Sequence, residues 1–158
     1  MKIVVTGGAG LVGSALISKL IKDPQNEVTA AFHNKPIVVN NINTIQVELT
    51  NFNDCMNLLK GKDALINCAA KTFGAEIMAK EPLSLSMPNI IMNANLFEAA
   101  YQNEVKQVIF MGSTTAYPES DEALSESSIF LDEVYKSYFV VGNVKRIMEI
   151  LGKIYSSR

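Results

Sequence analysis

The chain has 158 residues, of which 48% are hydrophobic and 19% charged, and its formal net charge is −2. This composition excludes a disordered chain and provides enough apolar residues for the core of one domain. The slightly negative charge argues against nucleic acid or an anionic membrane surface as a partner.

Neither the cysteines nor the apolar segments suggest a secreted or membrane protein. Cys55 and Cys68 have no metal-ligand or redox spacing, and two thiols do not make a disulfide framework. No stretch reaches the roughly 18 apolar residues of a membrane span. Glycines from Gly7 onward interrupt the apolar N-terminal run, which excludes a signal peptide. We therefore expect a cytoplasmic protein without a metal site.

Strand and helix patterns alternate along the chain. Short apolar runs bounded by turn residues predict strands, and apolar residues at helical spacing predict helices. The predicted strands are Lys2–Thr6, Glu27–Phe32, Thr44–Leu49, Ala64–Cys68 and Lys106–Met111. The predicted helices are Ala9–Lys22, Asn51–Lys60, Asn89–Asn103 and Glu133–Tyr155.

This alternation predicts an α/β fold with a doubly wound parallel sheet. Apolar strands joined by helices pair in parallel, with helices on both faces of the sheet. We expect a single Rossmann domain over residues 1–158, with strand order 3-2-1-4-5. Ligands bind at the carboxyl ends of the strands in such sheets, which directs attention to the irregular segment Gly112–Asp132 after the fifth strand.

A glycine-rich turn joins the first predicted strand to the first predicted helix. Gly7 allows a tight turn, Gly10 lets the backbone approach a diphosphate, and Gly13 lets the helix pack closely on the sheet. The N–H groups around Leu11 and Val12 would bind the phosphate oxygens. Because the Gly-x-x-Gly-x-x-Gly motif ends a strand and opens a helix, it predicts a dinucleotide site rather than a turn without a ligand.

The residues after the second predicted strand bear on which dinucleotide is bound. An NAD-selective fold places an acid about 20 residues past the glycine loop. Here His33, Asn34 and Lys35 occupy that position, and no acid lies between Glu27 and Glu48. His33 and Lys35 suit a 2′-phosphate, with a solvated loop as the alternative. The sequence therefore favours NADP over NAD.

Several motifs together resemble one family. They are Thr6-Gly7-Gly8-Ala9-Gly10-Leu11-Val12-Gly13, Glu48-Leu49-Thr50, Asn67-Cys68-Ala69-Ala70, Asn89 and Gly112-Ser113-Thr114-Thr115-Ala116-Tyr117. They are similar to motifs of the extended short-chain dehydrogenase/reductases, the NAD-dependent epimerase/dehydratase group that acts on nucleotide sugars. The resemblance implies that Glu48 and Leu49 meet the adenine, and that Cys68, Ala69, Ala70 and Asn89 contribute to the cofactor site. It also implies a catalytic hydroxyl on Ser113.

Ser113 would hydrogen-bond the substrate oxygen whose proton moves during hydride transfer. Its place directly after the fifth predicted strand favours this role, and a simple turn-forming serine is the alternative.

The resemblance fails at the family's acid/base pair, Tyr-x-x-x-Lys. Lys145-Arg146-Ile147-Met148-Glu149 resembles the segment that begins with the family's lysine, which assigns that lysine to Lys145 and puts Val141 at the tyrosine position. Tyr138 is the nearest phenol, but seven residues of regular helix rise about 10.5 Å. A break or later helix start permitted by Gly142 would bring Tyr138 inward.

Two functions follow from these patterns. The first is an NAD(P)-dependent epimerase, dehydratase or reductase of nucleotide sugars, represented by its cofactor-binding half because the family's C-terminal substrate domain is absent from these 158 residues. The second is a catalytically inactive NADP-binding sensor, which would explain the missing tyrosine. Retention of Ser113 and Lys145 favours the enzyme. We also expect a homodimer formed through the last two helices.

Overall fold

The computed structural model describes residues 1–37, 39, 42–72, 80–81 and 83–157. The chain forms two compact units. The first, here called the sheet unit, comprises Met1–Ala70 and Asn95–Met111, and the second, the helical unit, comprises Lys71–Ala94 and Gly112–Arg158.

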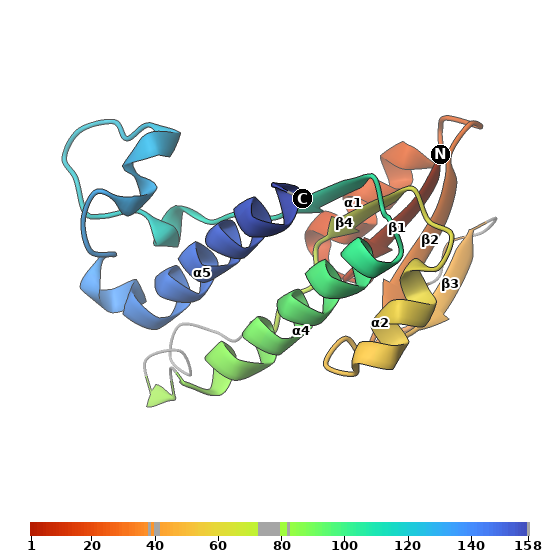
Figure 1. Cartoon of the computed structure of the whole chain (residues 1–158), viewed down its shortest axis with the longest axis horizontal. Coiled ribbons are helices and arrows are strands. Elements are labelled where there is room, and N and C mark those ends of the chain that lie inside the picture. The colour runs from red at the N-terminus through yellow and green to blue at the C-terminus, as the bar shows by residue number, and fades with distance from the viewer. Residues whose placement is uncertain (38, 40–41, 73–79, 82, 158) are drawn as a thin grey trace. The chain divides into compact units, whose positions relative to one another are not determined.

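The sheet unit contains a five-stranded parallel sheet with the order β3-β2-β1-β4-β5 (Figure 1). Its strands are β1 (Lys2–Thr6), β2 (Glu27–Phe32), β3 (Asn43–Gln46), β4 (Ala64–Asn67) and β5 (Gln107–Phe110). In the register of the central strand, Val4 lies opposite Thr29 of β2 and Leu65 of β4. The predicted doubly wound sheet and its strand order are confirmed.

Side chains on the two faces of the central strands form the core of the sheet unit. On one face, Ile3 and Val5 cluster with the fully buried Ile17 of helix α1 (Leu11–Leu20). Val4 alternates with these residues and points to the other face, where Leu65 is also fully buried. Because β1 and β4 are covered on both sides, their sequences are continuously apolar rather than alternating.

Helix α2 (Phe52–Leu59) packs in the same unit and begins at an asparagine cap. The Asn51 side chain accepts hydrogen bonds from the N–H groups of Asn53 and Asp54, which satisfies donors that the first helical turn leaves free. The end of helix α4 (Leu83–Gln102) also belongs to this unit, and Asn103 just beyond it donates to the carbonyl of Met56 at 3.2 Å. A polar contact thus joins α2 to the end of α4.

Helix α4 begins at Leu83, six residues earlier than the predicted start at Asn89, and contains Pro88. A proline within a helix removes one hydrogen bond and costs about 3 kcal/mol, which is why the sequence predicts a helix only after it. Burial of Leu85 and the hydrogen bond from Asn89 Nδ2 to the Leu85 carbonyl, at 2.7 Å, stabilise the extra turns. Tertiary contacts therefore override the local preference.

Helix α5 (Phe139–Ser156) begins six residues later than the predicted start at Glu133. Short 3₁₀ turns precede it at Thr114–Ala116, Glu126–Phe130 and Lys136–Tyr138. Val134 is buried and lies beside Gly142, so the chain before the helix folds back onto α5 instead of extending it. The prediction for the start of this helix was wrong because the sequence does not reveal this packing.

Gly142 provides a test of the helical unit. A β-carbon there would collide with the carbonyl oxygen of Thr115 and lie 3.0 Å from Val134. Replacing glycine by alanine inside a helix normally stabilises it by roughly 0.5–1 kcal/mol. We expect Gly142→Ala instead to lower the free energy of unfolding by about 1–2 kcal/mol, because the added methyl overpacks the contact. Denaturant unfolding measures this, and Asn143→Ala at the next helical position is the control. Stabilisation by Gly142→Ala would contradict the packing.

Candidate functional site

The glycine loop between β1 and α1 is built from close backbone contacts. Gly7 has φ +65°, a backbone conformation that residues with a side chain rarely adopt. The N–H of Gly10 donates a hydrogen bond to the carbonyl of Gly7 at 2.9 Å. A β-carbon on Gly7 would lie 2.6 Å from the Cys68 carbonyl oxygen, and one on Gly13 would collide with the carbonyl of Gly7. The loop therefore packs against the chain that leaves β4, at the carboxyl edge of the sheet.

The N-terminus of α1 is open to solvent. Gly10 is the N-cap without a side-chain hydrogen bond, and the first turn contains no acidic residue. Leu11 is 90% and Val12 54% exposed, so the first turn of the helix faces solvent. Free N–H groups and the positive end of the helix dipole favour an anion at this place. A single methyl on Gly10 would meet only the Gly7 carbonyl, at 3.2 Å.

A side-chain contact between His33 and Glu48 joins the loops that follow β2 and β3. His33 Nε2 lies 2.9 Å from Glu48 Oε2, and Gln46 Nε2 donates to the His33 carbonyl at 2.9 Å. The two residues follow β2 and β3, which are neighbours in the sheet. Adjacent parallel strands end at the same edge of the sheet. The predicted strand order therefore already placed the loops that carry His33 and Glu48 next to each other. Asn34 and Lys35 lie next to His33, exposed to solvent.

The carboxylate of Glu48 is held on its other side by Thr50. Thr50 donates to Glu48 Oε1 from its backbone N–H at 3.0 Å and from its hydroxyl at 2.6 Å. These hydrogen bonds, with a smaller contribution from attraction to His33, lower the pKa of Glu48. The neighbouring Leu49 is buried, and its carbonyl accepts a hydrogen bond from Asn95 Nδ2 at 3.0 Å.

The segment after β4 is fixed to the end of β1. The buried Thr6 hydroxyl donates to Asn67 Oδ1 at 2.5 Å, and Ala69 N–H donates to the same oxygen at 3.1 Å. Cys68 is half-buried, and burial raises the pKa of its thiol. Burial also raises the pKa of Cys55, to about 12. Both cysteines are therefore thiols rather than nucleophilic thiolates.

In the helical unit, Asn89 clamps the backbone at Lys71. Asn89 Oδ1 accepts from the Lys71 N–H, and Asn89 Nδ2 donates to the Lys71 carbonyl, both at 2.9 Å. With its further hydrogen bond to Leu85, the amide uses both of its N–H donors on backbone carbonyls. Asn89 thus fixes the chain directly after Ala70.

Ser113 begins the first 3₁₀ turn and is half-buried. Its Oγ lies 2.8 Å from the Thr115 hydroxyl and accepts from the Thr115 N–H at 3.2 Å. Helix α5 packs against this turn and restrains it through two contacts. Arg146 Nε donates to the Ala116 carbonyl at 2.7 Å, and Gly142 lies against the Thr115 carbonyl. The backbone that carries the Ser113 hydroxyl is therefore held in one conformation by these contacts.

Lys145 lies on α5, whereas Tyr138 ends the 3₁₀ turn before that helix, seven residues earlier in the chain. Burial lowers the pKa of Lys145, and attraction to Glu149, one turn later, opposes the shift. Tyr138 immediately precedes the first residue of α5, is 43% exposed, and packs edge-on against Tyr135 with ring centroids 5.8 Å apart. Gly142 is inside the regular helix and does not break it. Val141, half-buried, stands one turn before Lys145.

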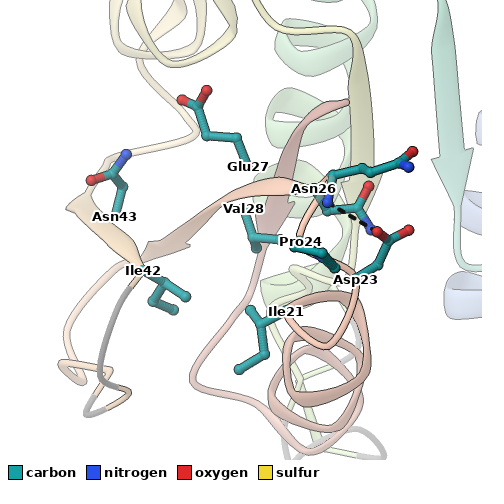
Figure 2. A pocket seen from close by; sticks show the side chains of 9 residues that line it. Ile21, Asp23, Pro24, Asn26, Glu27, Val28, Ile42 and Asn43 are labelled. Atoms are coloured by element: carbon teal, nitrogen blue, oxygen red, sulfur yellow. Dashed lines mark hydrogen bonds between the residues drawn. The ribbon is translucent and has the colours of Figure 1, made fainter.

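A separate cavity of about 710 Å³ lies in the sheet unit (Figure 2). It is lined by the end of α1, the loop Asp23–Asn26 and the first residues of β2 and β3. Because it touches the amino ends of the strands, it lies at the opposite edge of the sheet from the glycine loop. In the part of the chain that the structure describes, no group of three or more metal-ligating side chains and no helix suited to span a membrane is found.

Comparisons with known proteins agree with this geometry. The chain is 34% identical over 119 residues to a GDP-L-fucose synthase of Sinorhizobium fredii, a match covering 75% of the chain and 34% of the relative. Its fold is similar to that of a UDP-N-acetylglucosamine 4-epimerase from Methanobrevibacter ruminantium, with 31% identity, a TM-score of 0.80, and coverage of 99% of the chain and 50% of the solved structure. A UDP-glucuronic acid 4-epimerase from Bacillus cereus, solved with UDP-glucuronic acid and NAD, shares the fold at 24% identity, with a TM-score of 0.82 and coverage of 100% and 53%.

The chain spans between about a third and a half of the length of the curated relatives it matches. The sequence profile of the NAD dependent epimerase/dehydratase family matches residues 3–147, which is most of the chain. On this match, and on the parallel sheet with its glycine loop, the chain belongs to the NAD dependent epimerase/dehydratase family.

Proposed function

We propose that this chain is the cofactor-binding part of an enzyme that transfers hydride between NAD(P) and a nucleotide-activated sugar. The observation that carries the proposal is the open N-terminus of α1, reached through a loop whose glycines are required by backbone contacts. In this proposal the diphosphate lies on Gly10, Leu11 and Val12, while Gly7 and Gly13 shape the loop. The match to a GDP-L-fucose synthase supports the nucleotide-sugar class of substrate.

We assign the remaining cofactor contacts to residues at the same edge of the sheet as the glycine loop, and to Asn89. His33, Asn34 and Lys35 are assigned to the adenosine ribose, where the two basic side chains favour NADP. Glu48 and Leu49 are assigned to the adenine. Cys68, Ala69, Ala70 and Asn89 are assigned to the path of the cofactor beyond the diphosphate, Asn89 through its clamp on Lys71.

The proposed chemistry uses three side chains of the helical unit. Ser113 polarises the substrate oxygen, Lys145 binds the nicotinamide ribose, and Tyr138 exchanges the proton. The partial burial of Lys145 on α5 and the rigid support of Ser113 suit these roles. Val141 at the expected tyrosine position favours a second candidate function, an NADP-binding regulatory module without turnover.

The glycine loop is tested by Gly10→Val. A branched side chain on Gly10 would occupy the space into which the diphosphate approaches, so we expect affinity for NAD and NADP to fall at least tenfold. Isothermal titration calorimetry measures this, after circular dichroism has shown that the variant is folded. Ser18→Val, on the exposed far end of α1, is the control and keeps wild-type affinity. Unchanged binding by folded Gly10→Val would contradict the assignment.

The proton-transfer role is tested by Tyr138→Phe in the protein that carries this chain. Loss of a general acid/base lowers rates by roughly 10²–10⁴, so we expect kcat to fall by that factor while the dissociation constant of the cofactor stays the same. Chromatographic separation of substrate and product, with a panel of UDP- and GDP-sugars, gives the rate, because an epimerase or dehydratase returns the hydride and leaves no net change in nicotinamide absorbance. Tyr135→Phe removes the neighbouring hydroxyl and is the matched control.

Two outcomes would redirect the proposal. Equal rates in wild type and Tyr138→Phe would transfer the proton-exchange role to Ser113. Tight NADP binding without turnover of any sugar nucleotide by the wild type would favour the regulatory module.

We further propose that the chain forms a homodimer through α4 and α5. On α4, Leu83, Met87 and Ile91 are 75%, 59% and 38% exposed and recur every fourth residue. On α5, Ile147, Ile150 and Ile154 are 46%, 48% and 53% exposed at similar helical spacing. Apolar stripes of this kind on surface helices are typical of an interface.

The dimer is tested by introducing charge into the stripe on α5. We expect the double variant Ile150→Glu, Ile154→Glu to be monomeric, because burying two carboxylates without partners costs more than the apolar contacts contribute. Light scattering coupled to size-exclusion chromatography gives the mass in solution. Leu124→Glu, an exposed leucine outside both helices, should leave the dimer intact. A monomeric wild type would contradict the proposal.

A further inference from the structure

His33 is the only histidine of the chain, and it is fixed at two points. Gln46 donates to its backbone carbonyl at 2.9 Å, and its ring nitrogen Nε2 lies 2.9 Å from Glu48 Oε2. Both partners come from the chain that ends β3, beside the end of β2. The imidazole therefore has a defined orientation at the edge of the sheet, although its side chain is 60% exposed.

The acceptor on the other side of this contact is also fixed. Glu48 Oε1 takes two hydrogen bonds from Thr50, leaving Oε2 to face His33. The same hydrogen bonds lower the pKa of Glu48, so that it is an ionised carboxylate at neutral pH. An ionised carboxylate only accepts hydrogen bonds. The contact therefore requires the proton of His33 to be on Nε2.

This requirement decides what the second ring nitrogen does. In a neutral imidazole with its proton on Nε2, Nδ1 is an acceptor, and in the protonated ring Nδ1 becomes a donor. Histidine is the side chain that changes charge between about pH 5 and 8. The other charged groups next to the pair are Lys35, two residues along the same loop, and Asp54, whose Oδ2 lies 3.4 Å from the Glu48 backbone nitrogen.

We propose that Glu48 orients His33 so that the protonation state of the His33 ring decides whether it binds the 2′-hydroxyl of NAD or the 2′-phosphate of NADP. Neutral His33 accepts a hydrogen bond at Nδ1 from the 2′-hydroxyl of NAD, in place of the acid that NAD-selective folds carry there. Protonated His33 donates from Nδ1 to the 2′-phosphate of NADP. The inference rests on the proposed function, since it requires the dinucleotide to lie on the glycine loop.

The consequence is a cofactor preference that depends on pH. Acid conditions favour NADP, and mildly alkaline conditions favour NAD. Lys35, the second cation of the loop, adds attraction for the 2′-phosphate without exchanging donor for acceptor. Glu48 acts here as a positioning residue, because it selects the nitrogen of His33 that faces the cofactor.

Calorimetric titration of the chain with NAD and with NADP at pH 6, 7 and 8 tests the proposal. We expect the ratio of NADP to NAD affinity to rise about fivefold from pH 8 to pH 6, as for one partly exposed charge-assisted hydrogen bond. His33→Gln reports the background, because the 2′-phosphate itself titrates near pH 6. Lys35→Ala should weaken NADP at every pH and keep the wild-type pH dependence.

Nuclear magnetic resonance of the single imidazole tests the role of Glu48 without any cofactor. Long-range ¹H–¹⁵N correlations at pH 8 should show the Nε2–H form in the wild type and a mixture of both forms in Glu48→Ala. A wild-type Nδ1–H form would overturn the inference, as would a pH dependence equal to that of His33→Gln. Failure of both dinucleotides to bind at every pH would instead overturn the proposed function, and this inference with it.

Discussion

The contact between the glycine loop and the chain leaving β4 is the constraint on which the sheet unit depends. Gly7 reaches the backbone of Cys68 and Ala69 at distances that exclude any side chain, and Gly13 meets Gly7 in the same way. Because the backbone of the loop packs directly on the backbone after β4, the carboxyl ends of β1 and β4 lie close together. The first turn of α1 then faces solvent. The proposed anion site is thus a consequence of how the strands pack, and its backbone conformation does not depend on a ligand.

A second close contact organises the helical unit. Gly142 lets α5 approach the Thr115 carbonyl, and Arg146, one turn later, donates to the Ala116 carbonyl. The guanidinium of Arg146 also lies over the ring of Phe130, 5.9 Å from its centroid. One helix therefore supports the turn that begins with Ser113 and carries Lys145 between the two supporting residues. This arrangement suits a site in which a hydroxyl and an ammonium must keep fixed positions.

The chain keeps the family's cofactor loop while departing from its acid/base pair. The proposed cofactor binding uses backbone groups, so it depends on glycines and on strand packing, which are intact. The proposed proton transfer depends on the identity of one side chain, and Val141, at the position where the resemblance places a tyrosine, has no proton to exchange. The residue at position 141 can differ without disturbing the glycine loop, because Val141 lies inside the regular helix α5 and takes no part in that loop. The proposed cofactor binding and the proposed turnover of a sugar nucleotide therefore depend on different residues.

The sequence by itself determined the strands, their order and the glycine loop, because apolar runs, helical periodicity and glycine spacing are local signals. Only the tertiary structure decided where α4 and α5 begin. Burial of Leu85 outweighed the cost of Pro88, and packing of Val134 against Gly142 moved the start of α5 to six residues after the predicted one. The predicted strand order places the ends of β2 and β3 at one edge of the sheet, but the contact between His33 and Glu48, 15 positions apart in the chain, was decided only by the tertiary structure. Contacts between residues distant in sequence leave no periodicity to recognise.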